Sequence, residues 1–339
     1  MSSLLHDEFA SGNDEAGQTK TVLSEHEAEL CVAAKEVVAE QVVAVTLSDP
    51  AARMLPAWTP GAHVDLVLTD SLTRQYSLCG NPSDRRQWRI GVLRDPESRG
   101  GSAFVHEHLE AGSTVRVRGP RNHFPLISSP RYQFVAGGIG ITPLLPMMAE
   151  ATATGSEWNL LYGGRSRDSM AFLDRLAGYG DRVEVHPQDE HGMLDLDALL
   201  GEPVFDTLVY CCGPEGLLSA VEAKCAGWPA ESLHVERFAA RPQGTDQSTA
   251  NAAFELVLRR SGITLEVPAD KSVLEVIEDA GVSVLASCYE GICGTCETAV
   301  IGGLPDHRDS VLTESERAAN DVMMICVSRC RGKCLTLDL

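Results

Sequence analysis

Several features that would indicate a membrane, secreted or nucleic-acid-binding protein are missing from this sequence. It contains no run of about 18 apolar residues, so it predicts no transmembrane helix. The opening residues 1–8 (MSSLLHDE) lack the basic and apolar regions of a signal peptide. Bases are scarce, because 28 Lys and Arg stand against 48 Asp and Glu, and the net charge of −20 would repel nucleic-acid phosphates. We therefore expect a cytoplasmic protein that binds neither membranes nor nucleic acid.

The chain is long for a single domain. At about 150 residues per domain, 339 residues predict two or three domains. Its eleven cysteines are an odd number in a chain without a secretion signal, which argues against a disulfide framework. Six of them crowd the C-terminal region and indicate a metal site there: Cys288, Cys293, Cys296, Cys326, Cys330 and Cys334.

The pattern of predicted elements divides the chain into segments. Residues 1–28 are acidic and aperiodic, which predicts a largely disordered leader. Short β-rich runs separated by Gly and Pro turns fill residues 29–128 and predict a small antiparallel β-barrel. In residues 129–238 strands alternate with helices, which predicts a parallel sheet. Residues 239–252 have the composition of a linker, and residues 253–339 open with a predicted hairpin and a capped helix.

The first three cysteines of the C-terminal group have the spacing C-x4-C-x2-C. With a fourth thiolate further along the chain, this is the plant-type ferredoxin pattern that binds a [2Fe-2S] cluster. A structural zinc site is the alternative, but such sites usually pair two short knuckles and only one is present. The fourth ligand has three candidates, and we favour Cys326 because the apolar residues 322–325 would bury it beside the cluster.

Two segments of the predicted barrel suit a flavin. Arg74, Tyr76 and Ser77 offer a cation for a phosphate, an aromatic face for the isoalloxazine and a hydroxyl for a ring nitrogen. Taken alone, the same residues could be an ordinary surface arginine and rim tyrosine. A second segment precedes a predicted helix whose first N–H groups could hold a phosphate, although a plain glycine turn would look the same; it contains Arg99, Gly100, Gly101 and Ser102.

Three segments follow the strands of the predicted parallel sheet. The first is a turn that opens a helix, as in dinucleotide-binding sites, although tight turns also take glycine for steric reasons; it contains Gly137, Gly138, Gly140 and Thr142. The second contains Arg165 and Arg167, which are either ligands of an NADPH 2′-phosphate or solvated loop charges. The third strand ends at Cys212, Gly213 and Pro214.

In this order, the motifs resemble the phthalate dioxygenase reductase and vanillate demethylase reductase family over about residues 30–339. The resemblance implies an antiparallel β-barrel that binds FMN, an α/β parallel-sheet domain that binds NAD, and an α+β, β-grasp-like ferredoxin domain. FMN is favoured over FAD because no adenine-binding segment is evident, and NADH is favoured over NADPH. The resemblance also places Cys212 near the nicotinamide and Phe238 over the flavin, so that Ser77, Cys212 and Phe238 are the candidate catalytic residues.

The implied function is that of the reductase component of a multicomponent oxygenase, with a Rieske-type aromatic oxygenase as partner. NADH gives up two electrons as hydride, whereas an iron oxygenase accepts them singly. FMN can accept the pair and release single electrons, and a [2Fe-2S] cluster carries one at a time. The alternatives are a reductase that serves a cytochrome P450 and a redox-sensing electron-transfer module.

Overall fold

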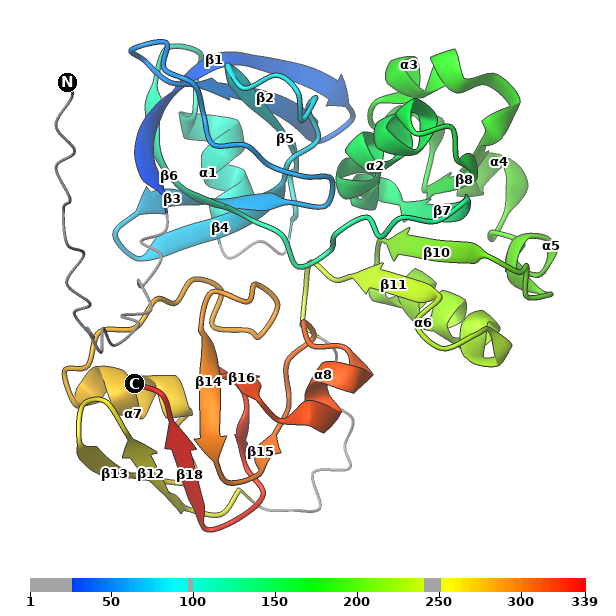
Figure 1. Cartoon of the computed structure of the whole chain (residues 1–339). Coiled ribbons are helices and arrows are strands. Elements are labelled where there is room, and N and C mark those ends of the chain that lie inside the picture. The colour runs from blue at the N-terminus through cyan, green and yellow to red at the C-terminus, as the bar shows by residue number, and fades with distance from the viewer. Residues whose placement is uncertain (1–25, 97–99, 241–250) are drawn as a thin grey trace, which may run out of the picture.

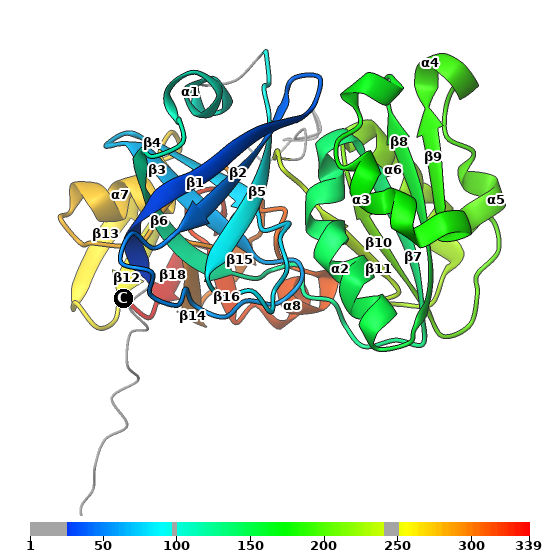
Figure 2. The same ribbon diagram turned by 90° about the horizontal axis from the view of Figure 1, so that it is seen from above.

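The computed structural model describes residues 26–96, 100–240 and 251–339. The chain forms three units, which Figure 1 shows in blue to cyan, in green, and in yellow to red. Figure 2 shows the same arrangement from above, with the barrel beside the green unit. Most of the predicted leader and linker, together with Arg99, lies outside the described residues. None of the described helices is long and apolar enough to cross a membrane.

The first unit is an antiparallel barrel with the strand order β4-β3-β6-β1-β2-β5. An isolated bridge between Leu78 and Ile90 joins the two ends of this sheet and closes the barrel. β-Branched and aromatic residues such as Val64 and Trp88 fill its interior. The first strand starts one residue before the predicted end of the leader. The elements are β1 (Glu27–Ala39), β2 (Val42–Ser48), β3 (His63–Thr69), β4 (Leu72–Ser77), β5 (Gln87–Leu93), α1 (Gly101–His108) and β6 (Thr114–Arg121).

The second unit is a parallel sheet with the strand order β11-β10-β7-β8-β9. Its strands are β7 (Arg131–Gly137), β8 (Glu157–Gly164), β9 (Val183–Pro187), β10 (Thr207–Cys212) and β11 (Leu233–Glu236). Its α-helices are α2 (Ile141–Ala153), α3 (Leu173–Leu176), α4 (Gln188–His191), α5 (Leu196–Leu200) and α6 (Glu215–Lys224). Its 3-10 turns are η1 (Gly138–Gly140), η2 (Arg167–Ser169), η3 (Ala177–Arg182) and η4 (Cys225–Gly227).

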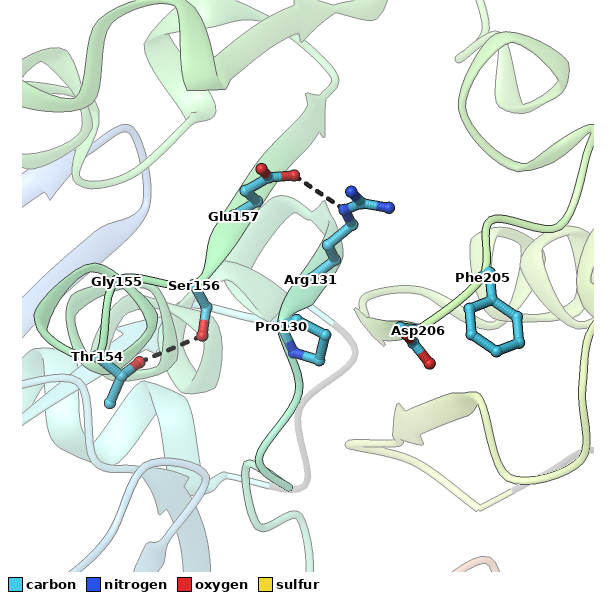
Figure 3. A pocket seen from close by; sticks show the side chains of 8 residues that line it. All are labelled: Pro130, Arg131, Thr154, Gly155, Ser156, Glu157, Phe205 and Asp206. Atoms are coloured by element: carbon cyan, nitrogen blue, oxygen red, sulfur yellow. Dashed lines mark hydrogen bonds and ion pairs between the residues drawn. The ribbon is translucent and has the colours of Figure 1, made fainter.

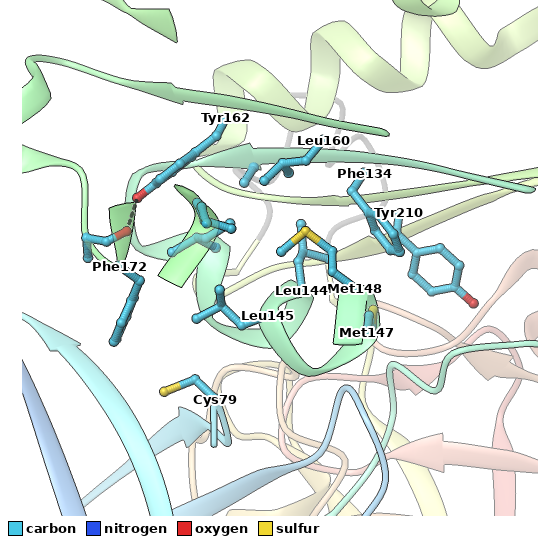
Figure 4. Packing of buried hydrophobic residues seen from close by; sticks show 14 of the residues in the cluster. Cys79, Phe134, Leu144, Leu145, Met147, Met148, Leu160, Tyr162, Phe172 and Tyr210 are labelled. Carbon is cyan, nitrogen blue, oxygen red and sulfur yellow. Dashed lines mark hydrogen bonds between the residues drawn. The ribbon is translucent and has the colours of Figure 1, made fainter. Parts of the chain in front are cut away.

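The barrel and the parallel sheet share one hydrophobic core. Side chains of α2 pack beneath Phe134 and Tyr210 of the sheet, and the barrel residue Cys79 lies on the far side of the same helix (Figure 4). Val42 and Phe124 of the barrel unit belong to this cluster as well. Continuous apolar packing therefore holds the first two units together.

The third unit is a mixed sheet with the strand order β13-β12-β18-β14-β16, in which only the pair β12 and β18 is parallel. The predicted capped helix is α7, whose Ser272 and Glu275 form the expected capping box. The helix packs on the sheet around a core of its own. The elements are β12 (Phe254–Leu258), β13 (Ile263–Val267), α7 (Val273–Asp279), β14 (Glu297–Gly302), β15 (Pro305–Asp306), α8 (Glu314–Ala319), β16 (Val322–Met324), β17 (Arg329–Cys330) and β18 (Cys334–Leu337). The predicted fold class is confirmed for all three units.

Candidate functional site

The predicted phosphate-binding residues of the barrel lie together. A Cβ atom on Gly101 would collide with the side chain of Arg74, so this arginine runs along the start of α1. Gly100 precedes the helix with φ of 90° and provides no side-chain cap, which leaves N–H groups of the first turn for another acceptor. Ser102 accepts a 3.1 Å hydrogen bond from the backbone N–H of Asp95. A cation beside a helix N-terminus fits an anionic phosphate.

Tyr76 and Ser77 end strand β4. Tyr76 is half-buried and packs against the barrel core, and burial raises the pKa of its phenol, which therefore stays protonated. Ser77 is buried, and its backbone pairs with that of His63 on β3. The barrel thus presents an aromatic ring and a hydroxyl at neighbouring positions of one strand end.

Ser77 meets the parallel sheet at Glu236. The hydroxyl of Ser77 donates to Oε2 of Glu236 at 3.4 Å, and the thiol of Cys212 points to the same oxygen at 3.9 Å. Cys212 and Glu236 are partners at the carboxyl ends of the parallel strands β10 and β11. Burial raises the pKa of Glu236 to about 8, and burial together with the Glu236 charge raises that of the Cys212 thiol well above its usual value. Near pH 7 the junction therefore holds a carboxyl proton and a neutral thiol.

Glu236 was not among the predicted site residues, although it lies only two positions before Phe238, which was predicted. It precedes Arg237, whose buried guanidinium binds Glu215 at 3.0 Å and Glu222 at 2.9 Å on α6. This anchor fixes the end of β11 against the helix. Phe238 follows with 42% of its surface exposed, so its ring is available to cover a ligand.

The glycine turns after β7 and β10 face each other. A Cβ on Gly140 would collide with the backbone carbonyl of Cys212, and one on Gly137 would lie 2.6 Å from Pro214. A Cβ on Gly213 would lie 3.0 Å from Gly137. Close packing alone thus accounts for these three glycines, whereas Gly138 has φ of 53° and open space around its Cα. Thr142 is buried and donates to the carbonyl of Ile139 at 2.9 Å. The turns lie at the carboxyl edge of the sheet, where ligands of such folds bind.

Of the two predicted nucleotide arginines, one is paired. Arg167 binds Glu190 through contacts of 3.2 and 3.3 Å, while Arg165 is exposed. A carboxylate beside Arg167 would repel a 2′-phosphate at this position.

A hollow of ≈430 Å³ lies at the opposite edge of the same sheet. Arg131, Glu157 and Asp206 line it at the amino ends of β7, β8 and β10 (Figure 3). Because nucleotides bind at the carboxyl ends of parallel strands, this hollow is not the predicted nucleotide site.

The four predicted cluster ligands lie together in the third unit. Cys288 hydrogen bonds with Cys293 and Cys326, and these bonds hold the pKa of Cys288 well below its usual value. Cys296 and Cys326 form the other contact. Within the described residues no three His, Cys, Asp or Glu side chains converge on one metal position. The sulfurs instead form a chain of contacts, from Cys293 through Cys288 and Cys326 to Cys296, and four thiolates are what a [2Fe-2S] cluster requires.

The loop around these thiols also fits a cluster. Backbone N–H groups of Glu290 and Thr295 donate to the sulfurs of Cys288 and Cys293 at 3.3 and 3.4 Å. Gly294 has φ of 71°, a conformation that favours glycine. Such a donor set, with soft sulfur ligands and N–H groups directed at them, suits iron and sulfide.

The remaining two tail cysteines lie elsewhere. Cys330 and Cys334 flank the turn between β17 and β18. The sulfur of Cys330 accepts from the N–H of Gly332 at 3.3 Å and lies 3.4 Å from the carbonyl oxygen of Cys334. The structure therefore groups Cys326, and neither of these two, with the C-x4-C-x2-C loop.

Comparison with known proteins gives concordant matches. The model of the 2Fe-2S iron-sulfur cluster binding domain matches residues 256–331. The phenoxybenzoate dioxygenase subunit beta of Ectopseudomonas oleovorans is 45% identical over 89% of this chain and 94% of its own. The vanillate O-demethylase oxidoreductase of a Pseudomonas species (strain HR199) is 41% identical over 92% and 99%.

Two solved structures extend these matches to the fold. An intact type IV self-sufficient cytochrome P450 monooxygenase aligns at 48% identity with a TM-score of 0.88, over 92% of this chain and 41% of its own. Phthalate dioxygenase reductase, described as a modular structure for electron transfer from pyridine nucleotides to [2Fe-2S], aligns at 36% identity with a TM-score of 0.67, over 92% and 98%. The chain therefore belongs to the phthalate dioxygenase reductase and vanillate demethylase reductase family, the flavin and iron-sulfur reductase components of multicomponent oxygenases.

Proposed function

We propose that this reductase takes electrons from NADH into FMN on the barrel and passes them through a [2Fe-2S] cluster to a Rieske-type oxygenase. The contact of Ser77 and Cys212 with Glu236 carries the proposal, because it joins the predicted flavin strand to the predicted nicotinamide strand at one buried point. The proposed domains are residues 29–128 for FMN, 129–238 for NADH and 253–339 for the cluster, with residues 1–28 as leader and 239–252 as linker.

In the flavin site, Arg74 and the start of α1 bind the phosphate of FMN. The guanidinium would donate to the phosphate oxygens, and residues 100–102 would supply N–H groups and the Ser102 hydroxyl. Tyr76 would lie against the isoalloxazine, and the Ser77 hydroxyl would turn from Glu236 to donate to a ring nitrogen. FMN is favoured over FAD because these residues suit a terminal phosphate and no adenine-binding segment is evident in the sequence.

At the junction, this chain's residues exclude water and hold a proton. Bound FMN supplies the conversion of a hydride into single electrons. Cys212 is buried and neutral, so it adds no negative charge beside the nicotinamide. The protonated Glu236 carboxyl, which Ser77 contacts, keeps a proton within reach of the same position. Phe238, with its ring exposed, would cover the flavin and would give way to the nicotinamide.

In the nucleotide site, the turn at Gly137, Gly138, Gly140 and Thr142 and the segment Gly213 and Pro214 receive the dinucleotide at the sheet edge. NADH is favoured over NADPH because Arg167 is bound by Glu190 at 3.2 Å. A 2′-phosphate would have to compete with that carboxylate for the guanidinium. Arg165 then contacts the rest of the nucleotide.

In the cluster domain, Cys288, Cys293, Cys296 and Cys326 hold the two irons. The Rieske assignment follows two relatives whose names refer to a dioxygenase and an O-demethylase. A cytochrome P450 is the second candidate partner, since the P450 fusion aligns with a TM-score of 0.88.

The test is cofactor analysis of anaerobically purified protein together with steady-state kinetics. We expect released FMN, about two irons and acid-labile sulfide per chain, and lower kcat/KM with NADPH than with NADH. Reduced protein is then mixed with a Rieske oxygenase and with a P450 in a stopped-flow instrument. Zinc in place of iron would overturn the cluster assignment, FAD would overturn the FMN assignment, and faster reduction of the P450 would reverse the order of partners.

A further inference from the structure

The outer face of the barrel touches the predicted cluster loop directly. A Cβ atom on Gly294 would collide with the ring of His123, which follows β6. The His123 ring stacks on that of His63 from β3, with ring centroids 5.9 Å apart and planes inclined by 26°. Figure 1 shows this loop as the orange segment that precedes β14, beneath β3 and β4. The loop therefore lies against the barrel with no side chain of its own at Gly294.

The same barrel face carries a buried ion pair. Nη2 of Arg121, at the end of β6, lies 2.7 Å from Oδ1 of Asp65 on β3. The Asp65 side chain is fully buried and that of Arg121 is 15% exposed. Burial raises the pKa of Asp65 to about 6, opposed by the hydrogen-bonding effects of Ser287 and Gln75. Because Ser287 directly precedes Cys288, the carboxyl also faces the cluster loop.

The cation of this pair is directed at the cluster ligands. Arg121 interacts electrostatically with the sulfurs of both Cys293 and Cys288, and Asp65 interacts with that of Cys288. Burial lowers the pKa of His63 to about 3 and also lowers that of His123, so both rings are neutral near pH 7. Arg121 therefore presents a positive charge to the loop, whereas the two histidine rings beside it are neutral.

We propose that Arg121, held by Asp65, is a positioning residue for electron transfer from the flavin to the cluster: it fixes the loop on the barrel and stabilises the reduced cluster. The proposal rests on the cluster assignment made under the proposed function. One electron leaves the reduced flavin and enters the cluster, whose charge becomes more negative by one unit. A guanidinium beside two of the ligating sulfurs favours that charge, and partial burial weakens the screening by solvent.

The functional consequence concerns the balance between the two cofactors. An electron moves from flavin to cluster only if the cluster's reduction potential is high enough. Arg121 raises that potential only while the third unit is docked on the barrel, because the cation belongs to the barrel. Docking therefore makes the cluster a better acceptor at the place where it receives its electron.

The test is an EPR-monitored redox titration of the holoprotein, with iron content measured for every variant. We expect Arg121→Gln to lower the equilibrium constant for reduction of the cluster about tenfold, which is ~59 mV for a one-electron couple. Arg121→Lys keeps the charge and is expected to restore most of the shift. The matched control is Arg116→Gln on the same strand, whose side chain is 40% exposed and lies 3.7 Å from Glu27.

A second variant keeps the test decisive if Arg121→Gln does not fold, since that change leaves Asp65 buried without its partner. Asp65→Asn combined with Arg121→Gln removes both charges, and we expect a lowered potential there too, because the guanidinium interacts with the sulfurs of both Cys293 and Cys288. An unchanged potential in an iron-replete variant, or an equal shift in Arg116→Gln, would overturn the proposal. Wild-type protein without iron and sulfide would instead overturn the cluster assignment itself.

Discussion

The barrel contacts its two neighbours in contrasting ways. Its junction with the parallel sheet is apolar, since Val42, Cys79 and Phe124 share one core with α2 and the sheet. Its junction with the third unit is polar and charged, because Asp65 and Arg121 of the barrel face the cluster loop. The third unit also has a separate hydrophobic core.

The contrast matches what each junction must do. Hydride transfer needs two rings in contact in a site without water, which a shared core provides. Transfer of a single electron needs only proximity, so a polar contact of the kind found between separable domains is sufficient. The two junctions nevertheless adjoin each other, because Ser77 of the first is the cross-strand partner of His63 of the second. One strand pair of the barrel thus serves both the entry and the exit of electrons.

The strongest way to separate the two junctions is to remove the cluster. We expect Cys293→Ser to abolish the iron-sulfur absorption and reduction of the oxygenase, because one ligand of four is lost. Reduction of ferricyanide by NADH should persist, since hydride transfer uses only the first two units. Both activities are followed by absorbance. Loss of flavin reduction in a folded Cys293→Ser protein would contradict the sequential path.

The tail cysteines give a matched set for the same site. Cys326→Ser should destroy the cluster's absorption and EPR signal, because its sulfur contacts those of Cys288 and Cys296. Cys330→Ser and Cys334→Ser should leave both signals intact, since these residues flank a turn at the other end of β17. The opposite pattern would identify a different fourth ligand.

The flavin site offers the next largest effect. Arg74→Ala removes a charge-assisted contact to the phosphate, worth roughly 2 kcal/mol or more, so we expect FMN to dissociate at least about tenfold more readily. Tyr76→Ala should act in the same direction. Fluorescence of released FMN measures the dissociation constant, and exposed Arg86→Ala is the control. Unchanged retention in Arg74→Ala would exclude this arginine as the phosphate ligand.

The buried carboxyl of Glu236, at the junction of the barrel with the parallel sheet, makes the stability of the folded protein depend on pH. The pKa of Glu236 is about 8 in the folded protein against an ordinary value of 4.5. The folded state therefore binds more protons than the unfolded state between these values, and stability falls as pH rises through this window. Relative to Glu236→Gln, the wild type should lose roughly 4 kcal/mol between pH 5 and pH 9.

Thermal unfolding of the two holoproteins across this pH range measures the difference directly. Glu184→Gln is the control, because that side chain is 70% exposed. Parallel stability curves for wild type and Glu236→Gln would show that the carboxyl is ionised in the folded protein.

The smallest expected effect is the salt dependence of electron transfer to the partner oxygenase. Residues 253–339 carry fourteen acids and eight bases, a net charge of −6, and Glu297 lies beside Glu316 next to the cluster loop. We expect a basic docking surface on the oxygenase. Reduction of the oxygenase should slow as salt rises from about 0.05 to 0.5 M, where the screening length falls below about 5 Å. Reduction of ferricyanide should slow less, and equal salt responses in stopped-flow measurements would remove the case for electrostatic docking.

The sequence was informative wherever a site is local in the chain. Three of the four predicted cluster ligands lie within one nine-residue segment, and the capping box of α7 spans Ser272 to Glu275, so spacing alone indicates both. Glu236 and Ser77 are 159 positions apart, and each looks ordinary in its own segment. Arg121 and Asp65 likewise meet only because β6 pairs with β3. Burial and pairing across units, which no local pattern encodes, create these contacts.

The absence of a side chain at Gly294 has a consequence for engineered reductases. A chimera that joins a foreign ferredoxin module to this barrel must bring a glycine to the position facing His123. With any larger residue there, the module would be pushed away from the barrel, and the distance that the electron crosses would increase. Compatibility between modules would then depend on one position of the loop as much as on the linker that connects them.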